Sequence, residues 1–282
     1  MASSEVAPIA KLASSDAQGG LALSAASGWN QTLDDWRFFI AHGHAVGCRD
    51  ELGRLVGTAA ALPYDGGAGW ISMVLVDPAW RHRGLASRLM GECIRHLQEA
   101  GLTPTLDATP AGQGVYGQLG FAPGFAFERW EGEGWAAATG DDEVRVARPD
   151  DLDALAARDR EALGGIGRAA LLRDFLGRRA TQAWVHANGS AFVVARAGQR
   201  ATQVGPLVAS TVGAALTLLG HTFARTAGRV FIDVPVRAAA VADTLAQRGF
   251  VRQRPFVRMT LGAAPPHEPH ATLFALAGPE FG

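Results

Sequence analysis

One stretch constrains the fold more than any other: an apolar strand, a short polar loop and a long amphipathic helix follow one another directly. Residues 70–76 form an apolar run typical of a buried strand. Asp77-Pro78 ends it, because proline cannot donate a ladder hydrogen bond. Four apolar residues then recur at every fourth position of a predicted helix over 84–100: Leu85, Leu89, Cys93 and Leu97. A strand and a helix that each bury one face predict an α/β chain.

The loop between this strand and this helix has the chemistry of an anion site. The first backbone N–H groups of a helix have no partner within the helix, and the helix dipole adds positive charge there. Gly84 lets the backbone approach a bulky group, and Arg81 and Arg83 add positive charge. These residues predict a site for an anion the size of a diphosphate, without identifying the anion.

The pattern Arg81-x-x-Gly84-x-Ala86 after an apolar strand resembles motif A of the GNAT superfamily of N-acetyltransferases. The resemblance implies that the strand binds the pantetheine arm of acetyl-CoA through its backbone and that the loop amides hold the pyrophosphate. The alternative is an ordinary strand–helix turn. The residues implied in cofactor binding are Met73, Val74, Leu75, Val76, Arg81, His82, Arg83, Gly84, Leu85, Ala86 and Ser87.

A second resemblance lies downstream, where Tyr116-Gly117-Gln118-Leu119-Gly120-Phe121 matches a Y-x-x-L-G-F element found in many of these enzymes. The resemblance implies that Tyr116 is the catalytic general acid that protonates the departing thiolate. A phenol with a pKa of about 10 stays protonated at neutral pH and suits this role. The alternative is a packing residue with its hydroxyl at the surface.

The general base and the acceptor site are less defined. The strand carries Ser72 and no carboxylate, so Asp107 on the next predicted strand is a candidate, although it could equally fix a local turn. Trp29, Asn30 and Asp34 place an aromatic face, an amide and a carboxylate close together. This combination suits a cationic amine.

Two neighbouring residues have simpler explanations. Asp35 stands three residues after Thr32, the spacing of a helix capping box. Trp36 follows on the same predicted helix, at a position where core packing is at least as plausible as substrate contact.

The predicted elements fall into two halves with the same order: strand, two helices, three strands, helix, strand, helix, strand. We place a first domain at 1–135, a linker at 136–143 and a second domain at 144–282. The second half has no R-x-x-G-x-A pattern, and Val204–Thr211 stands in its place, so one coenzyme site is expected. Ile232–Pro235 resembles a string in the C-terminal, acetyltransferase-like domain of tandem bacterial GNAT proteins.

Composition excludes several other classes. The formal net charge is −1, which disfavours nucleic acid as a partner, and no apolar run is long enough to span a membrane. Two cysteines without metal-ligand spacing predict neither a disulfide framework nor a metal site. The N-terminus lacks a signal-peptide layout, so a cytoplasmic location is expected. The sequence leaves open whether the chain is a monomer or a homodimer.

The resemblance implies two tandem domains, each a mixed, mostly antiparallel sheet flanked by helices, of which the first is active. It implies an enzyme that transfers acetyl from acetyl-CoA to a primary amine of a small molecule or peptide by direct attack, without a metal. The alternative is a non-catalytic sensor or interaction protein that binds acyl-CoA.

Overall fold

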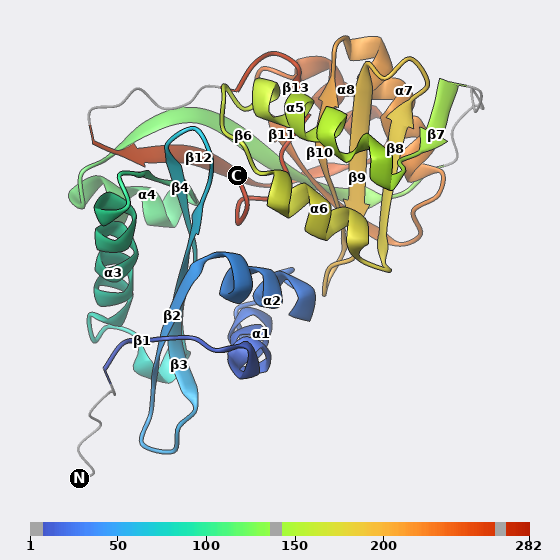
Figure 1. Ribbon diagram of the computed structural model, residues 1–282. Coiled ribbons are helices and arrows are strands. Elements are labelled where there is room, and N and C mark those ends of the chain that lie inside the picture. The colour runs from blue at the N-terminus through green and yellow to red at the C-terminus, as the bar shows by residue number, and fades with distance from the viewer. Residues whose placement is uncertain (1–7, 136–142, 263–268) are drawn as a thin grey trace. The chain divides into compact units, whose positions relative to one another are not determined.

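The computed structural model describes residues 8–135, 143–262 and 269–282 (Figure 1). It divides into two compact units, one up to Leu106 and one from Asp107 onward. The strands and helices of each unit are described by themselves. No helix in the described ranges is long and apolar enough to cross a membrane.

The sheet of the first unit has its strands in chain order. Neighbouring strands are antiparallel except for the last pair, which is parallel. The strands are β1 (Ala10–Lys11), β2 (His44–Arg49), β3 (Leu55–Pro63), β4 (Ala68–Val76) and β5 (Thr103–Ala108).

Helices cover both faces of this sheet. Figure 1 shows α1 (Ala17–Ala26) and α2 (Leu33–His42) on one side of β2 and β3, and α3 (Leu85–Glu99) on the other. The predicted stripe of α3 is confirmed, since Leu85, Leu89, Cys93 and Leu97 are all buried.

The start of α2 is fixed locally, as its sequence predicts. The Thr32 amide donates to Asp35 Oδ2 over 2.7 Å, and the Asp35 amide donates to Thr32 Oγ1 over 3.3 Å. This reciprocal pair satisfies two helix-terminal donors. Trp36 is fully buried and donates to Ser24 Oγ over 2.9 Å, so it belongs to the core.

The sheet of the second unit has the order β12-β6-β11-β10-β9-β8-β7, with β13 paired to β10. Only β10 and β11 are parallel among the pairs within it. The strands are β6 (Phe121–Glu133), β7 (Val144–Val146), β8 (Thr181–His186), β9 (Ala191–Arg196), β10 (Thr202–Ala209), β11 (Arg229–Pro235), β12 (Val251–Leu261) and β13 (Leu273–Ala275).

Helices again pack on both faces. Buried residues of α7 and α8 share one apolar core with β9, β10 and β11, while α5 and α6 contact β10 and β8. The helices are α4 (Pro110–Gln118), α5 (Leu152–Ala162), α6 (Ala169–Gly177), α7 (Val212–Phe223) and α8 (Ala239–Gln247). Mixed, mostly antiparallel sheets flanked by helices confirm the predicted fold class.

Residues 107–135 pack in the second unit because β6 is hydrogen-bonded on both sides to strands from later in the chain. Its residues 127–133 pair with β11, and its residues 121–131 pair with β12. The domain limits at 135 and 144 stay a prediction. Of the predicted linker, 136–142 lies outside the described residues.

Candidate active site

The strand predicted to bind the cofactor contains a bulge at Met73. Ser72 pairs with Ala60 and Leu75 pairs with Thr58. Two residues of β4 therefore lie between these pairs, opposite only one residue of β3. Met73 has φ 53°, a left-handed conformation that is costly for a residue with a Cβ. The hydroxyl of Thr58 donates to the Met73 carbonyl over 3.0 Å and holds the bulge. Such bulges re-aim backbone groups and are frequent beside active sites.

The same strand parts from its neighbour on the other side. The parallel register pairs Ala68–Trp70 with Thr103–Thr105 and, in the described part of these strands, goes no further. β4 nevertheless continues to Val76, paired with β3. The stretch Met73–Val76 therefore has a backbone edge that β5 does not cover. This open edge lies on the strand that the sequence predicts to bind the pantetheine arm. The binding itself stays a prediction.

The loop after β4 is shaped by its own hydrogen bonds. Asp77 Oδ1 accepts from the Ala79 amide over 2.9 Å and starts a short 3₁₀ turn, Pro78–Trp80. Arg81 Nε donates to the Val76 carbonyl over 3.2 Å. Arg83 donates to the Ala79 carbonyl over 3.2 Å, and its guanidinium lies 4.8 Å from the centre of the Trp80 ring. Both arginine side chains are exposed, and these hydrogen bonds hold them against the loop backbone.

The loop ends with two residues of left-handed backbone conformation. His82 has φ 61° and Gly84 has φ 74°, so two left-handed residues flank Arg83. Alternating backbone conformations of this kind are typical of nests, in which successive N–H groups turn toward an anion. A Cβ at Gly84 would meet nothing within 4 Å. Glycine is therefore required here for its conformation and not for space.

Gly84 is also the N-cap of α3, and no side chain caps this helix. Leu85 points into the core and is 2% exposed, while Ala86 and Ser87 are exposed. The first-turn amides of α3 thus lie at the surface beside the nest, with the dipole of a 15-residue helix behind them.

In the second unit the corresponding strands also part, but another segment fills the gap. β10 pairs with β11 only over Thr202–Val204 in the described residues. Beyond that point β13 takes over: Leu207 faces Ala275, the Ala209 amide donates to Thr272, and the Leu276 amide donates to the Asp233 carbonyl of β11. The free edge present in β4 has no counterpart in β10.

The helix after β10, α7, also differs from α3, because a side chain caps its N-terminus. The Thr211 hydroxyl accepts from the Ala214 amide over 3.2 Å and caps α7. This cap satisfies a donor that is left open at Gly84. The expectation of one coenzyme site, in the first half, stays a prediction.

Tyr116 lies in the second unit, near the end of α4. Its ring is half-buried, packs over Gly112 and has its centre 6.1 Å from that of Phe121. A Cβ added at Gly112 would lie 2.8 Å from the tyrosine ring, so glycine makes room for it. Burial raises the pKa of the Tyr116 phenol, which keeps it protonated at neutral pH. Its catalytic role stays a prediction.

Asp107 is also in the second unit and is fully buried in an ion pair. Arg258 donates to both of its carboxylate oxygens, over 3.0 and 3.1 Å. Burial raises the pKa of the Asp107 carboxyl, and the guanidinium opposes that rise. No local pattern indicates this partner, which lies 151 residues away. A role of Asp107 in acceptor binding stays a prediction.

The predicted acceptor residues of the first unit lie in different environments. Asn30 is buried, Trp29 is half-buried and Asp34 is exposed, paired with Arg37 over 3.0 Å on the surface of α2. The adjacent Gln31, whose amide the sequence places in the same group, has an Oε1 that is buried without a hydrogen-bond partner among the described residues. Buried polar atoms of this kind call for an explanation, such as a bound molecule.

Ser72 resembles Gln31 in this respect, because its Oγ is buried beside the Met73 bulge without a hydrogen-bond partner. Within the described ranges, no group of three or more His, Cys, Asp or Glu side chains is arranged to hold a metal ion.

Two family models match the chain, one in each half. The model of the acetyltransferase (GNAT) family matches residues 19–121, and that of an acetyltransferase (GNAT) domain matches 156–275. The chain is 23% identical over 247 residues to YitH of Bacillus subtilis, an uncharacterized N-acetyltransferase, covering 85% of this chain and 86% of YitH.

Solved structures share the fold. A candidate acetyltransferase from Pyrococcus horikoshii superposes with a TM-score of 0.78 at 19% identity, covering 96% of this chain and 94% of that one. A tandem GNAT protein from the clavulanic acid biosynthesis pathway has a TM-score of 0.65 at 17% identity, with 93% and 99% covered.

Proposed function

The chain belongs to the GNAT family of acetyltransferases, with two domains of that family in tandem, and from this premise we propose that it transfers acetyl from acetyl-CoA to a primary amine. Family membership supports acyl transfer in general. The acetyl donor, the amine acceptor and direct attack are the proposal. The observation that carries it is the strand with a free edge that leads, through a left-handed nest, to an uncapped helix.

We assign the cofactor to this strand and loop. The backbone of Met73–Val76 binds the pantetheine arm as an additional strand would, through the edge that β5 leaves free. The amides from His82 to Ser87 hold the pyrophosphate, with Gly84 at the centre and Arg81 beside it. Arg83, stacked on Trp80, adds a second positive charge near the nest.

Acetyl-CoA supplies a thioester carbonyl and a thiolate leaving group. The backbone amides exposed by the Met73 bulge polarise the carbonyl, and such preorganised donors stabilise the negative charge that develops there. A neutral amine attacks directly, because the strand offers no side-chain nucleophile beyond Ser72. As the carbon–sulfur bond breaks, the Tyr116 phenol gives its proton to the departing sulfur. Water takes the proton that the attacking nitrogen loses, and the tyrosine regains its proton from water.

The acceptor is a small-molecule or peptide amine. Trp29, Asn30 and Asp34 remain our assignment for its recognition, since an aromatic face and a carboxylate both favour a cationic group. The buried Oε1 of Gln31 has no hydrogen-bond partner among the described residues, and we assign it to accept a hydrogen bond from an N–H group of this amine.

The test measures release of free CoA thiol with a panel of amines: a polyamine, an aminoglycoside, an amino acid and a peptide. Tyr116→Phe should lower kcat about 100-fold or more, as expected for loss of a general acid, with the acetyl-CoA affinity nearly unchanged. Tyr64→Phe is the matched control, because Tyr64 is the other of the two tyrosines. An unchanged kcat in the Tyr116 variant would remove the assignment of the acid.

Two further results decide between catalysis and sensing. Calorimetry should find one acetyl-CoA per chain, since β13 covers the second edge, and two per chain would contradict that reasoning. Binding of acetyl-CoA without thiol release for any amine would favour a non-catalytic acyl-CoA sensor.

A further inference from the structure

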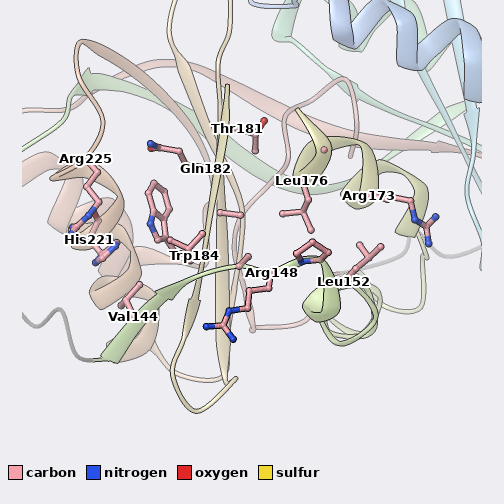
Figure 2. A pocket seen from close by; sticks show the side chains of 15 residues that line it. Val144, Arg148, Leu152, Arg173, Leu176, Thr181, Gln182, Trp184, His221 and Arg225 are labelled. Carbon is pink, nitrogen blue, oxygen red and sulfur yellow. The ribbon is translucent and has the colours of Figure 1, made fainter. Parts of the chain in front are cut away.

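Two pockets of the chain differ in how their polar groups are arranged. One, of about 840 Å³, lies in the second unit, where Figure 2 draws Arg148 and Arg225 apart from each other. Its Trp184 is only 3% exposed, so little of that ring is open to a ligand. The other, of about 440 Å³, lies in the first unit beside α1, and we call it the α1 pocket. Its volume falls within the range of small-molecule sites.

One wall of the α1 pocket is a row of small side chains. Gly19, Ala22 and Ala26 are three and four residues apart, so they lie on one side of α1. Leu55 lies opposite, since a Cβ added at Gly19 would be 2.9 Å from Leu55 Cδ1. Ala22 and Ala26 are exposed and Leu55 is half-buried. The walls are therefore apolar and also accessible to a ligand.

The two arginines that line the α1 pocket already have carboxylate partners. Arg49 donates to Asp16 Oδ1 over 2.6 Å and to the Gly53 carbonyl over 3.0 Å. Arg54 donates to Asp50 Oδ2 over 2.7 Å. Each of these positive charges is therefore balanced by a negative charge beside it.

The carboxylate of Asp77 is the remaining charge of the lining. Its Oδ1 accepts from the Ala79 amide over 2.9 Å. Within the described ranges, its Oδ2 has no hydrogen bond and the carboxylate has no ion pair. Arg81, the nearest arginine along the chain, donates to the Val76 carbonyl instead. The α1 pocket therefore has one uncompensated negative charge, which favours a cation.

This negative charge lies next to the apolar wall. Leu55 and Val56 are consecutive, and the Asp77 amide donates to the Val56 carbonyl over 2.9 Å. Leu55 in turn lies against Gly19, one turn of α1 before Ala22. A molecule with a single ring is therefore long enough to touch the apolar wall and to reach Asp77.

We infer that the α1 pocket binds a small organic cation with an apolar part. The apolar part lies against Ala22 and Leu55, and the cationic group donates a charge-assisted hydrogen bond to Asp77 Oδ2. The proposed acetyl transfer does not require this site, so the two proposals can fail separately.

The probe is N,N-dimethylbenzylamine, which is protonated at neutral pH and, as a tertiary amine, forms no stable amide in the proposed acetyl transfer. N,N-dimethylbenzamide has the same ring without the charge and reports apolar binding alone. Each is titrated into the full chain, and its Kd is measured by ligand-observed NMR. We expect saturable binding of the cationic probe, with an affinity that falls as salt is added.

Replacing Asp77 by asparagine removes the charge and keeps an oxygen for the Ala79 amide. Asp77→Asn should weaken the cationic probe about threefold to tenfold, because a charge-assisted hydrogen bond is lost, and should leave the neutral probe nearly unchanged. The matched control is Asp34→Asn, which removes an exposed carboxylate of the proposed acceptor site in the same unit. A loss of affinity in Asp34→Asn without a loss in Asp77→Asn would place the probe at the acceptor site and overturn the inference.

A second pair of variants tests the apolar wall. Ala22→Leu should weaken both probes about threefold or more by filling the α1 pocket. Ala25→Leu is the matched control, because Ala25 is also exposed on α1 but does not line the pocket. Thermal unfolding of each variant checks that the fold is kept. Equal affinities in the Ala22 and Ala25 variants would overturn the inference, as would the absence of saturable binding.

Discussion

Replacing Gly84 by alanine tests the proposed cofactor loop with a single methyl group. The new Cβ meets no atom within 4 Å, so a clash cannot cause the effect. What changes is the conformational cost, since Gly84 has φ 74°. Gly91→Ala is the matched control: Gly91 is exposed within α3, also has no atom near its Cβ, and has ordinary helical conformation.

The two variants should shift the free energy of unfolding in opposite directions. A left-handed conformation costs an L-residue about 1–2 kcal/mol. Alanine also restricts the unfolded chain, which returns about 0.4–1 kcal/mol, so Gly84→Ala should lose about 1 kcal/mol overall. Gly91→Ala should gain up to about 1 kcal/mol, because glycine is a poor residue inside a helix. The expected difference between the variants is about 2 kcal/mol.

In the absence of acetyl-CoA, the loop of Gly84→Ala can relax and avoid this conformational cost. The cost then lowers the affinity for acetyl-CoA instead of the stability of the fold. If acetyl-CoA requires the left-handed conformation, its affinity falls by about 5- to 30-fold, the equivalent of 1–2 kcal/mol. The sum of the change in unfolding free energy and the change in binding free energy is therefore the informative quantity.

Urea unfolding gives the first term and calorimetry with acetyl-CoA gives the second. We expect a summed loss for Gly84→Ala, and a gain in stability with unchanged affinity for Gly91→Ala. A Gly84→Ala variant that matches Gly91→Ala in both measurements would show that the loop conformation does not matter for the cofactor, and the proposed cradle would be wrong.

Other predictions concern stability. Phe281 is fully buried, so Phe281→Ala should lower the free energy of unfolding by about 3–5 kcal/mol in urea titrations, and a loss below about 1 kcal/mol would show that this side chain is not packed in the core. Arg129 donates to both oxygens of buried Asp233 over 2.8 Å, so Arg129→Met should cost about 3–5 kcal/mol by leaving a buried charge, and replacing both residues by apolar ones should recover most of it. Arg145 lowers the pKa of Asp151 from 3.8 to about 2, so this pair contributes stability above pH 3.8 that is lost as the pH falls to about 2. Thermal unfolding between pH 2 and 5 should show a weaker pH dependence for Arg145→Met, and an identical slope would refute the pairing.

Features that depend on nearby residues were predictable from the sequence. The α3 stripe follows from residues four apart, and the Thr32–Asp35 capping box follows from residues three apart. Gly84 was identified from its place before an apolar periodic stretch, and its left-handed conformation gives that position a physical reason.

Features that depend on distant pairing were not predictable. The Met73 bulge is set by how β4 matches β3 and by a hydrogen bond from Thr58, and methionine gives no local sign of a left-handed residue. The Asp107–Arg258 ion pair joins residues 151 apart. The place of β6 in the second unit likewise depends on its pairing with β11 and β12.

The two halves of the chain have a similar bulge in corresponding strands, although their amino-acid sequences differ. In β4 three steps from Ser72 to Leu75 face two on β3, and in β10 three steps from Val204 to Leu207 face two on β9. The residue after Ser72 and the residue after Val204 both have positive φ, at 53° and 138°. This common irregularity supports an ancient duplication better than the order of elements alone.

The halves differ in what lies against the bulge. In β10 the residue is Gly205, where a Cβ would lie 1.8 Å from the Leu276 carbonyl oxygen. Pro206 follows it and has no N–H to donate. β13 then takes the remaining hydrogen bonds of this edge. In β4 the bulge carries Met73 and Val74, both with N–H groups, and β5 does not cover their edge. A backbone edge can bind either a strand of its own chain or a ligand, but not both at once. In the second half a strand of the chain itself covers this edge, whereas in the first half the edge is open to the proposed cofactor.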